Sequence, residues 1–414
     1  MRQCEAMMNK DTAIGIKTLS GGATVPEGFV AGGVVCGVRN SGRRDLGLLF
    51  SEFECTSAAV FTLNTVKGAP LLVTREAIQG GDVRAVVANS GYANAATGQR
   101  GLEDACEMRA LAAEALGVEA REVAVASTGV IGEHLPMAKI SAGIEGAAAE
   151  LGRAGAGFAE AILTTDTRTK EAAVQVEVGG KTITVGGTAK GSGMIHPNMG
   201  TMLAFLTTDA AVEKGCLQET LSAAAEHTFN RVTVDGDTSP SDMAVLLANG
   251  VAGNEPLTAG SADYPAFAEA VESVARELAK QIARDGEGAT RLVEVVVEGA
   301  KDEESAAALA KSVVGSNLVK AAVFGEDANW GRVLNAMGYS GVSFDPADVE
   351  LWFGPVKVFG SGEPAAHEEA EANAALASGE VRITARLGEG EASAKAWGCD
   401  LTYEYVRING SYRT

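Results

Sequence analysis

The stretch Lys190-Gly-Ser-Gly-Met-Ile-His-Pro-Asn-Met-Gly-Thr-Met-Leu-Ala-Phe-Leu206 holds one threonine, Thr201, between a turn sequence and a hydrophobic run. Pro197 and Gly200 mark the turn, and the apolar residues after Thr201 predict a buried element. A threonine hydroxyl is a weak nucleophile by itself, but an N-terminal threonine carries a base in its own α-amino group. Cleavage between Gly200 and Thr201 would therefore place nucleophile and base in one residue. Spacing alone favours the alternative, an ordinary loop that leads into a buried helix or strand.

Further segments along the chain combine glycine with asparagine, aspartate or threonine. They are Val60-Phe-Thr-Leu-Asn-Thr65 with Ala69-Pro70, Asn89-Ser-Gly-Tyr-Ala-Asn-Ala-Ala-Thr-Gly98, Ser127-Thr-Gly-Val-Ile-Gly132, Thr164-Thr-Asp-Thr167, Val234-Asp-Gly-Asp-Thr-Ser239, Gly325-Glu-Asp-Ala-Asn-Trp-Gly-Arg332 and Asn409-Gly-Ser-Tyr-Arg-Thr414. Together with the Thr201 stretch, they resemble the ornithine acetyltransferase (glutamate N-acetyltransferase, ArgJ) family, in the family's order. Gly200 stands where the family often has alanine, so a small residue still precedes the nucleophile. Without a Cβ, Gly200 can enter the strained turn that an N→O acyl shift needs.

Length and composition limit the class of protein. The chain has 414 residues, which is enough for two or three domains, and 46% of them are hydrophobic, which allows a substantial core. The 51 glycines, against 10 prolines, predict many tight turns. A formal net charge of −20 opposes binding to phosphate backbones, which needs clustered lysine and arginine. We therefore expect no nucleic-acid partner.

The potential metal ligands are scattered along the chain. The six cysteines and four histidines are Cys4, Cys36, Cys55, Cys106, Cys216, Cys399, His134, His196, His227 and His367. They form no C-x-x-C pair and no zinc spacing, so we expect free thiols, mostly buried, in a cytoplasmic protein without a bound metal. The N-terminus lacks the long apolar segment of a secretory signal, and no apolar run approaches about 18 residues. We expect no membrane span.

Apolar spacing and turn residues predict a mixture of helices and strands. Helices are expected over 102–116, 140–151, 264–283, 305–313 and 368–377. Strands are expected over 83–88, 123–126, 172–178, 182–185, 290–297, 349–358, 381–387 and 397–406. Gly179-Gly180-Lys181 is a strong hairpin signal. The alternation over 403–408 predicts that a docked terminal strand leads into Asn409.

This mixture, with its hairpins, predicts α+β layers rather than a doubly wound sheet. The resemblance implies a layered α/β/β/α sandwich of the self-cleaving, N-terminal-nucleophile type, with two lobes that share one active site. It divides the chain into an N-terminal fragment, 1–200, and a C-terminal fragment, 201–414. We expect a smaller C-terminal lobe at about 290–414, and the segment 253–263 is the best candidate for a loop between subregions.

Several residues fit the chemistry of acetyl transfer. Thr128 and Gly129 follow the predicted strand 123–126 at a glycine turn, which sequence alone would leave as an ordinary turn. The resemblance implies that the Thr128 hydroxyl and the Gly129 N–H stabilise an oxyanion, where one donor is worth on the order of 10²–10³ in rate. Lys190 could pair with a substrate carboxylate or stabilise the alkoxide during cleavage. By itself it would be read as a solvated side chain.

Other candidates would recognise amino-acid substrates. Glu287 lies between two glycines, where its carboxylate could bind the amine of ornithine or assist proton transfer; the alternative is a solvated turn residue. The resemblance implies that Asn409 and Thr414 contact substrate, as does one of Thr164 and Thr165, and the sequence does not decide which. We interpret seven further residues as framework of the glycine loops: Asn89, Asn94, Asp235, Asp237, Glu326, Asp327 and Trp330.

The resemblance implies an autoproteolytic acyltransferase of arginine biosynthesis. Thr201 would accept the acetyl group of N2-acetyl-L-ornithine and pass it to L-glutamate in a ping-pong cycle, without a bound cofactor. The family implies a heterotetramer, a dimer of fragment pairs. Whether acetyl-CoA is also a donor stays open. Two alternatives are an amidohydrolase or aminopeptidase with the same nucleophile, which Lys190, Glu287 and Asn409 argue against, and a non-catalytic amino-acid-binding protein.

Overall fold

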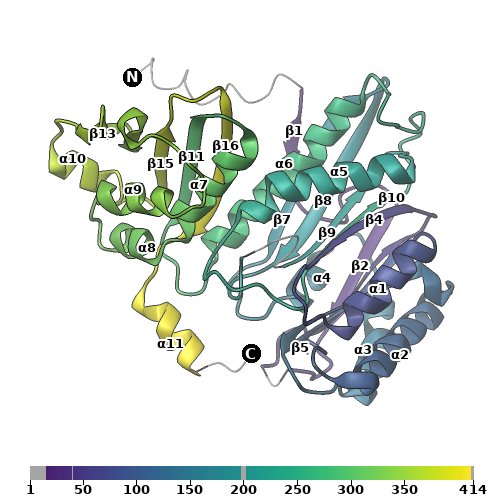
Figure 1. Cartoon of the computed structure of the whole chain (residues 1–414). Coiled ribbons are helices and arrows are strands. Elements are labelled where there is room, and N and C mark those ends of the chain that lie inside the picture. The colour runs from purple at the N-terminus through teal and green to yellow at the C-terminus, as the bar shows by residue number, and fades with distance from the viewer. Residues whose placement is uncertain (1–14, 40, 197–201, 412–414) are drawn as a thin grey trace.

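The computed structural model describes residues 15–39, 41–196 and 202–411. It has two parts, a larger one with two stacked sheets between helices and a smaller one built on a third sheet (Figure 1). Helix α6 (Tyr264–Arg284) packs on the first sheet and also contacts strands of the third, so it joins the two parts.

The first sheet has six strands in the order β1-β7-β8-β9-β10-β4. Their bounds are β1 Lys17–Leu19, β7 Lys170–Val178, β8 Lys181–Lys190, β9 Leu203–Thr208, β10 Met243–Ala248 and β4 Thr56–Phe61. The β7–β8 turn consists of Gly179 and Gly180, with φ of 57° and 72°. A two-residue turn between antiparallel strands needs such positive φ values, so the predicted hairpin is confirmed.

The centre of this sheet explains the hydrophobic run after Met202. Strands β9 and β10 are parallel, with Met243 opposite Leu203, and helix α5 (Lys214–His227) connects them. Every residue of both strands is buried, as expected for strands that are covered on both faces. The predicted buried element is therefore strand β9.

The second sheet has four strands in the order β2-β3-β5-β6. Their bounds are β2 Phe29–Val34, β3 Leu46–Ser51, β5 Ala85–Tyr92 and β6 Val123–Val130. Strands β5 and β6 are parallel and are connected by helix α2 (Gly98–Leu116). Both predicted strands in this region, 83–88 and 123–126, extend further toward their C-terminal ends than the apolar pattern indicated.

The two sheets and their helices form four layers. Leu203 and Phe205 of the first sheet pack against Val86 and Ala124 of the second in one apolar cluster. Helices α5 and α6 cover the outer face of the first sheet, while α2 and α3 (Met137–Ala149) cover the outer face of the second. The predicted α+β class and α/β/β/α layering are confirmed. Shorter helices α1 (Ala69–Gly80) and α4 (Ala156–Ala161) pack beside the sheets, and Pro70 lies in the first turn of α1, where a missing N–H is tolerated.

The third sheet lies in the smaller part and has the order β14-β13-β12-β15-β11-β16. Its strands are β11 Leu292–Ala300, β12 Glu350–Phe353, β13 Val356–Gly360, β14 Glu363–Pro364, β15 Glu380–Arg386 and β16 Ala392–Cys399. Its helices are α7 Glu303–Gly315, α8 Asn317–Phe324, α9 Trp330–Gly338 and α10 Glu369–Ala374. The predicted strand region 349–358 is a hairpin, and the predicted helix 368–377 is shorter than expected. Segment 253–263 is a loop, as predicted, but it connects β10 to α6 within the larger part and does not separate two subregions.

One prediction of secondary structure is wrong. The strand predicted over 397–406, with its alternation continuing to 408, ends at Cys399 in β16, and residues 403–408 belong to helix α11 (Tyr403–Ser411). None of the residues of α11 is buried, so the alternating apolar side chains have no core to face. The Thr402 hydroxyl accepts the Glu404 N–H at the start of the helix, and Arg407 pairs with Glu404 one turn later. The Thr402 cap and the Glu404–Arg407 ion pair therefore favour a helix over a strand in this segment.

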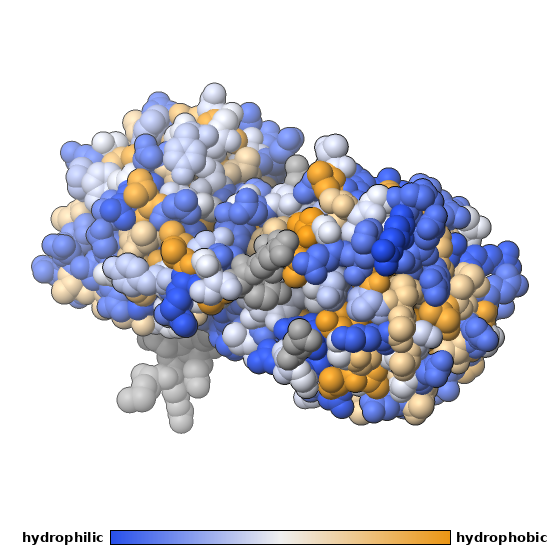
Figure 2. Space-filling view, turned by 90° about the horizontal axis from the view of Figure 1, so that it is seen from below, coloured by the Kyte–Doolittle hydropathy of each residue, from blue (hydrophilic) through white to orange (hydrophobic). Residues whose placement is uncertain are grey.

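Polar side chains cover most of the face seen in Figure 2, and apolar side chains are interspersed in small groups. The five cysteines within the described ranges are free, and two of them, Cys216 and Cys399, are buried; Cys4 lies outside these ranges. No single helix in the described part of the chain is long and apolar enough to cross a membrane. Helices α7 and α8 together have the length and apolar composition of a membrane-spanning segment, but they are bent by 56° at the break between them.

Candidate functional site

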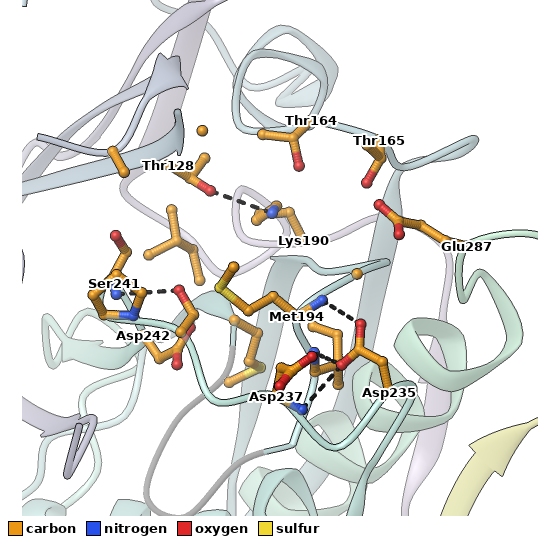
Figure 3. A pocket seen from close by; sticks show the side chains of 18 of the residues that line it. Thr128, Thr164, Thr165, Lys190, Met194, Asp235, Asp237, Ser241, Asp242 and Glu287 are labelled. Carbon is orange, nitrogen blue, oxygen red and sulfur yellow. Dashed lines mark hydrogen bonds between the residues drawn. The ribbon is translucent and has the colours of Figure 1, made fainter. Parts of the chain in front are cut away.

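One pocket of about 170 Å³ lies between strand ends of the two stacked sheets and helix α11 (Figure 3). All the predicted catalytic and substrate-binding residues within the described ranges line it: Thr128, Gly129, Thr164, Thr165, Lys190, Glu287 and Asn409. They come from the end of β6, the loop after α4, the last residue of β8, the loop after α6, and α11. Residues far apart in the sequence are therefore brought together.

Three predicted positions lie outside the described residues. These are Gly200 and Thr201 at the expected cleavage site and Thr414 at the C-terminus. The first described residues after Thr201, Met202 and Leu203, line the pocket.

The Thr128–Gly129 segment has a backbone that only glycine can adopt. Gly129 has a φ of +132°, and a Cβ there would lie 2.3 Å from the carbonyl carbon of Gly91. The two glycines are opposite each other in the parallel ladder of β5 and β6. The close approach of these strands therefore needs glycine, and it places Thr128 at the pocket wall.

Lys190 is 7% exposed and lies at the centre of the view in Figure 3. Its Nζ donates to Oγ1 of Thr128 at 3.3 Å. Burial lowers the pKa of Lys190 from its ordinary value, while the charge of Asp166 acts in the opposite direction. The predicted alternative, a solvated lysine, is wrong, because the side chain is buried among the residues of the pocket.

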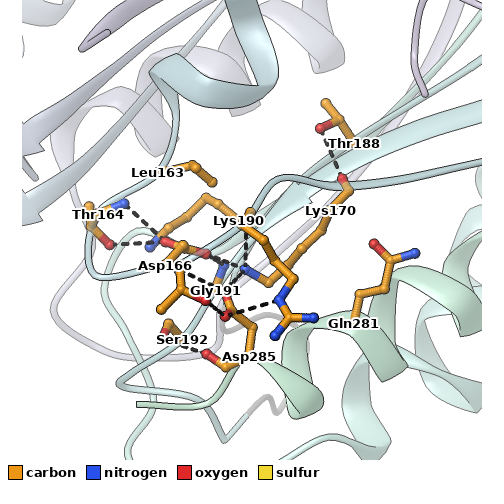
Figure 4. Close-up of polar contacts among 12 residues, drawn as sticks. Leu163, Thr164, Asp166, Lys170, Thr188, Lys190, Gly191, Ser192, Gln281 and Asp285 are labelled. Carbon is orange, nitrogen blue, oxygen red and sulfur yellow. Dashed lines mark hydrogen bonds and ion pairs between the residues drawn. The ribbon is translucent and has the colours of Figure 1, made fainter. Parts of the chain in front are cut away.

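A buried ionic network supports this wall from behind (Figure 4). Lys170 is fully buried, and its Nζ lies 2.7 Å from Oδ1 of Asp166 and 2.6 Å from Oδ2 of Asp285. Asp166 also accepts the backbone N–H of Gly191 at 2.7 Å and that of Thr164 at 2.9 Å. The network therefore fixes the end of β8 and the threonine loop to each other.

Glu287 is held on the opposite wall. The Ser192 hydroxyl donates to the Asp285 carbonyl oxygen at 2.7 Å, and the Glu287 N–H donates to the Ser192 carbonyl oxygen at 2.9 Å. Glu287 is 6% exposed and Oε2 of its side chain accepts from Nδ2 of Asn409 at 2.6 Å. A Cβ on Gly193 would lie 2.4 Å from the Glu287 carboxyl carbon, so Gly193 leaves the space that this side chain fills. Glu287 is thus a positioned carboxylate and not a solvated turn residue.

The residues interpreted as framework divide into two groups. Asp235 accepts the N–H groups of Met194 and Ile195 at 2.7 and 2.9 Å, next to the pocket that it and Asp237 line. The other members are hydrogen-bonded or packed elsewhere. Asn89 accepts from Ser127, Asn94 donates to Gly101, Glu326 pairs with Arg291, Asp327 accepts from Asn329, and Trp330 stacks on Phe359.

Three polar residues of the pocket were not predicted from the sequence. Ser241 and Asp242 lie at the start of β10, and Tyr405 lies on α11, where its hydroxyl donates to Asp235 at 3.3 Å. Burial raises the pKa of the Tyr405 hydroxyl, and the charge of Asp235 acts in the same direction. A signal for Ser241 and Asp242 was available, because they stand between the Val234–Ser239 segment and a hydrophobic run.

The arrangement suits acyl transfer. Donors lie at one wall, a carboxylate lies at the other, and the pocket adjoins Met202. Among the described residues, no group of three or more histidine, cysteine, aspartate or glutamate side chains could hold a metal ion.

Comparisons with known proteins agree on one family. The ArgJ family model matches residues 30–414. The arginine biosynthesis bifunctional protein ArgJ of Symbiobacterium thermophilum is 57% identical over 399 residues, which are 96% of this chain and 99% of that relative. The ArgJ protein of Bacillus subtilis is 50% identical over 401 residues, which are 96% of this chain and 98% of that relative.

Two solved structures are also similar. The crystal structure of ArgJ from Bacillus halodurans is 50% identical, with a TM-score of 0.49, and the match covers 50% of this chain and 98% of that chain. The ornithine acetyltransferase of Mycobacterium tuberculosis, complexed with ornithine, is 41% identical, with a TM-score of 0.41, and the match covers 44% of this chain and 98% of that chain.

Proposed function

The chain belongs to the ArgJ family, and from this membership we propose that it is an acyltransferase of arginine biosynthesis. It transfers the acetyl group of N2-acetyl-L-ornithine to L-glutamate, which gives L-ornithine and N-acetyl-L-glutamate. The observation that supports this most is the single pocket that collects every predicted site residue of the described ranges.

The first step of the proposal is self-cleavage. The Thr201 hydroxyl attacks the carbonyl carbon of Gly200, an ester replaces the peptide bond, and water then hydrolyses the ester. The products are the fragments 1–200 and 201–414, and within the second we take a smaller lobe to begin near residue 290. Ladder hydrogen bonds would hold the fragments together, because β8 pairs with β9 and β4 pairs with β10 across the cleavage point.

Acetyl transfer begins when the Thr201 hydroxyl attacks the acetyl carbonyl carbon of N-acetylornithine, with the α-amino group as base. Negative charge then develops on the carbonyl oxygen, and the Thr128 hydroxyl and the Gly129 N–H stabilise it. The bond from Lys190 to Thr128 supports this role. Because Nζ of Lys190 donates to the Thr128 oxygen, the Thr128 hydroxyl hydrogen remains available for the oxyanion.

Substrate recognition is assigned to the other walls. The Glu287 carboxylate would bind a substrate ammonium group, and Asn409 fixes its orientation through Oε2. The hydroxyls of Thr164 and Thr165 and the ammonium of Lys190 would bind substrate carboxylates, and Thr414 would contact substrate. Ornithine leaves, glutamate attacks the acetyl ester of Thr201, and the enzyme is regenerated without a bound cofactor.

The decisive measurement is the intact mass, under denaturing conditions, of the wild type and of Thr201→Ala. Two fragments that meet at Gly200–Thr201 are expected in the wild type and one uncut chain in the variant. Transfer from N-acetylornithine to glutamate should be present only in the cut protein. A wild type that stays uncut, or that transfers no acetyl group, would contradict the proposal. The same assay with acetyl-CoA in place of N-acetylornithine tests the second donor.

Assembly and location belong to the proposal as well. We infer a dimer of fragment pairs, which the native mass of the cut enzyme would test. We also assign the enzyme to the cytoplasm, because the described cysteines are free thiols, as is usual in reducing compartments.

A further inference from the structure

Two buried polar side chains at the start of β10 have no part in the steps above. Asp242 is 3% exposed and Ser241 is 7% exposed, and both line the pocket, on the side away from Glu287 in the view of Figure 3. Within the described residues, Oδ2 of Asp242 and Oγ of Ser241 have no hydrogen-bond partner. Leaving such an atom unpaired costs about 1–3 kcal/mol. The pair therefore points to a ligand group that completes it.

Asp242 lies close to the reacting part of the pocket. The N–H of Met243 donates to the Met202 carbonyl oxygen at 3.0 Å, so Asp242 is beside the residue that is covalently bonded to Thr201. Lys190, on β8, is the charged side chain that acts on the Asp242 carboxyl. The other titratable groups that line the pocket are Asp235, Asp237, Glu287 and Tyr405.

Acetyl transfer between two amines needs a group that gives up one proton in the first half-reaction and takes one back in the second. When the acetyl–nitrogen bond of N-acetylornithine breaks, the nitrogen must gain two protons to leave as an ammonium group. The Thr201 hydroxyl supplies only one of them. In the second half-reaction the ammonium group of glutamate loses two protons, and one of them returns to Thr201. The remaining proton is needed in the first half-reaction and released in the second.

We propose that Asp242 stores this proton between the two half-reactions. Its carboxyl group protonates the leaving amine of ornithine and, as a carboxylate, then removes a proton from the ammonium group of glutamate. No proton is gained or lost over the cycle. Ser241 Oγ would accept a hydrogen bond from the same amine. This assignment rests on the acetyl transfer proposed above and adds a catalytic residue to it.

The environment of Asp242 suits both states. Burial raises the pKa of Asp242 well above its ordinary value, although the charge of Lys190 and hydrogen bonds from Ser239 act in the opposite direction, so the site favours the protonated carboxyl more than water does. After the proton has left, Lys190 stabilises the carboxylate. Glu287 is left to bind the substrate ammonium group, because its Oε2 is held in place by the Asn409 side-chain amide.

The test compares Asp242→Asn with the wild type in four single-turnover reactions. N-acetylornithine and p-nitrophenyl acetate would each acetylate the enzyme, and glutamate and hydroxylamine would each remove the acetyl group. Nitrophenolate leaves without a proton, and hydroxylamine is largely uncharged at neutral pH. We expect a loss of at least about 10²-fold with N-acetylornithine and glutamate, as is typical of a lost general acid or base. With the other two reagents the rates should change less than about threefold.

A matched control is Asp104→Asn on α2. Asp104 is also buried and also has an unpartnered Oδ2 within the described residues, but it does not line the pocket. Its four rates should equal those of the wild type. A uniform loss in all four reactions of Asp242→Asn, or no loss in any, would overturn the proton-storage role. A wild type that fails to use N-acetylornithine would instead contradict the proposed function itself.

A measurement on the wild type covers the case in which Asp242→Asn does not fold or cut itself. Acetylation by N-acetylornithine needs the protonated carboxyl, so its rate should fall as pH rises through the pKa of Asp242. Acetylation by p-nitrophenyl acetate should lack this alkaline decrease. Identical pH profiles for the two donors would overturn the proposal.

Discussion

Replacement of Lys170 by methionine should destabilise the fold strongly. Lys170 is fully buried between Asp166 and Asp285, at 2.7 and 2.6 Å. Methionine fills a similar volume but leaves two buried carboxylates that repel each other. Asp166 retains its bonds to Gly191 and Thr164, so its charge stays inside the protein. Removing one partner of a buried ion pair typically lowers the free energy of unfolding by about 3–5 kcal/mol.

The loss should depend on pH with a defined sign. Burial would raise the pKa of Asp166, but the charges of Lys170 and Lys190 more than offset this and hold the pKa below its usual range. A carboxyl whose pKa is lowered in the folded state adds stability above its unfolded pKa, which is about 3.9, and this stability is lost as pH falls further. Without Lys170, burial dominates and the pKa of Asp166 rises. The difference between variant and wild type should therefore be largest at neutral pH and shrink toward pH 4.

The assay is denaturant unfolding, followed by circular dichroism, in the uncut Thr201→Ala background, so that fragments cannot separate. Lys181→Met, at the exposed β7–β8 turn, is the matched control and should change the unfolding free energy by less than about 0.5 kcal/mol. The triple variant with Asp166→Asn and Asp285→Asn removes all three charges and should recover part of the loss. A Lys170→Met loss below about 1 kcal/mol, or a triple variant less stable than the single one, would refute the reasoning.

Three further changes test the pocket. Thr128→Ala removes one oxyanion donor and should lower kcat for acetyl transfer by about 10²–10³-fold in a steady-state assay, with little effect on the melting temperature. Gly129→Ala should abolish transfer and lower the melting temperature, because the new Cβ would lie 2.3 Å from Gly91. The control is Gly132→Ala, which also has positive φ but has open space around it. It should lower the free energy of unfolding by only about 1–2 kcal/mol. Asn409→Ala should raise KM for the amino-acid substrates more than it lowers kcat, and should leave thermal unfolding unchanged because α11 has no buried residue. Equal effects of Gly129→Ala and Gly132→Ala, or a lowered melting temperature of Asn409→Ala, would contradict these assignments.

The sequence predicted the layers and the pocket residues for different reasons. Apolar runs with clear spacing predicted α2, α3, α6 and α7, and the two glycines at 179–180 predicted a hairpin, because these signals are local. The site residues were predicted from the resemblance and not from spacing. Thr128, Lys190 and Glu287 each look like ordinary turn or surface residues until the fold brings them together.

What the sequence could not predict depends on contacts between distant residues. Asp166, Lys170 and Asp285 form one network although Asp285 is more than 100 positions away, and no pattern in the sequence marks their burial. Asp242 follows the Val234–Ser239 segment in the sequence, but only the structure shows that its side chain is buried and lines the pocket. The alternation over 403–408 was misleading because a strand pattern assumes a core on one side, and α11 has none.

Strand pairing on either side of the proposed cleavage point would let one chain become two without loss of its structure. Lys190, the last residue of β8, pairs with Leu203, the first residue of β9, so the connection 191–202 begins and ends at neighbouring ladder positions. A cut within a connection whose ends are held by strand pairing removes no ladder hydrogen bond. The cut changes only the entropy of closing the connection 191–202, and this entropy depends weakly on the length of a loop. Lys190 and Met202 line one pocket, and the same pairing would keep them there after the proposed cleavage. Because the flanking strands are fixed, the new N-terminus of Thr201 would stay tethered to the start of β9, beside Asp242, and the residues that would assist cleavage would also be those that assist acetyl transfer.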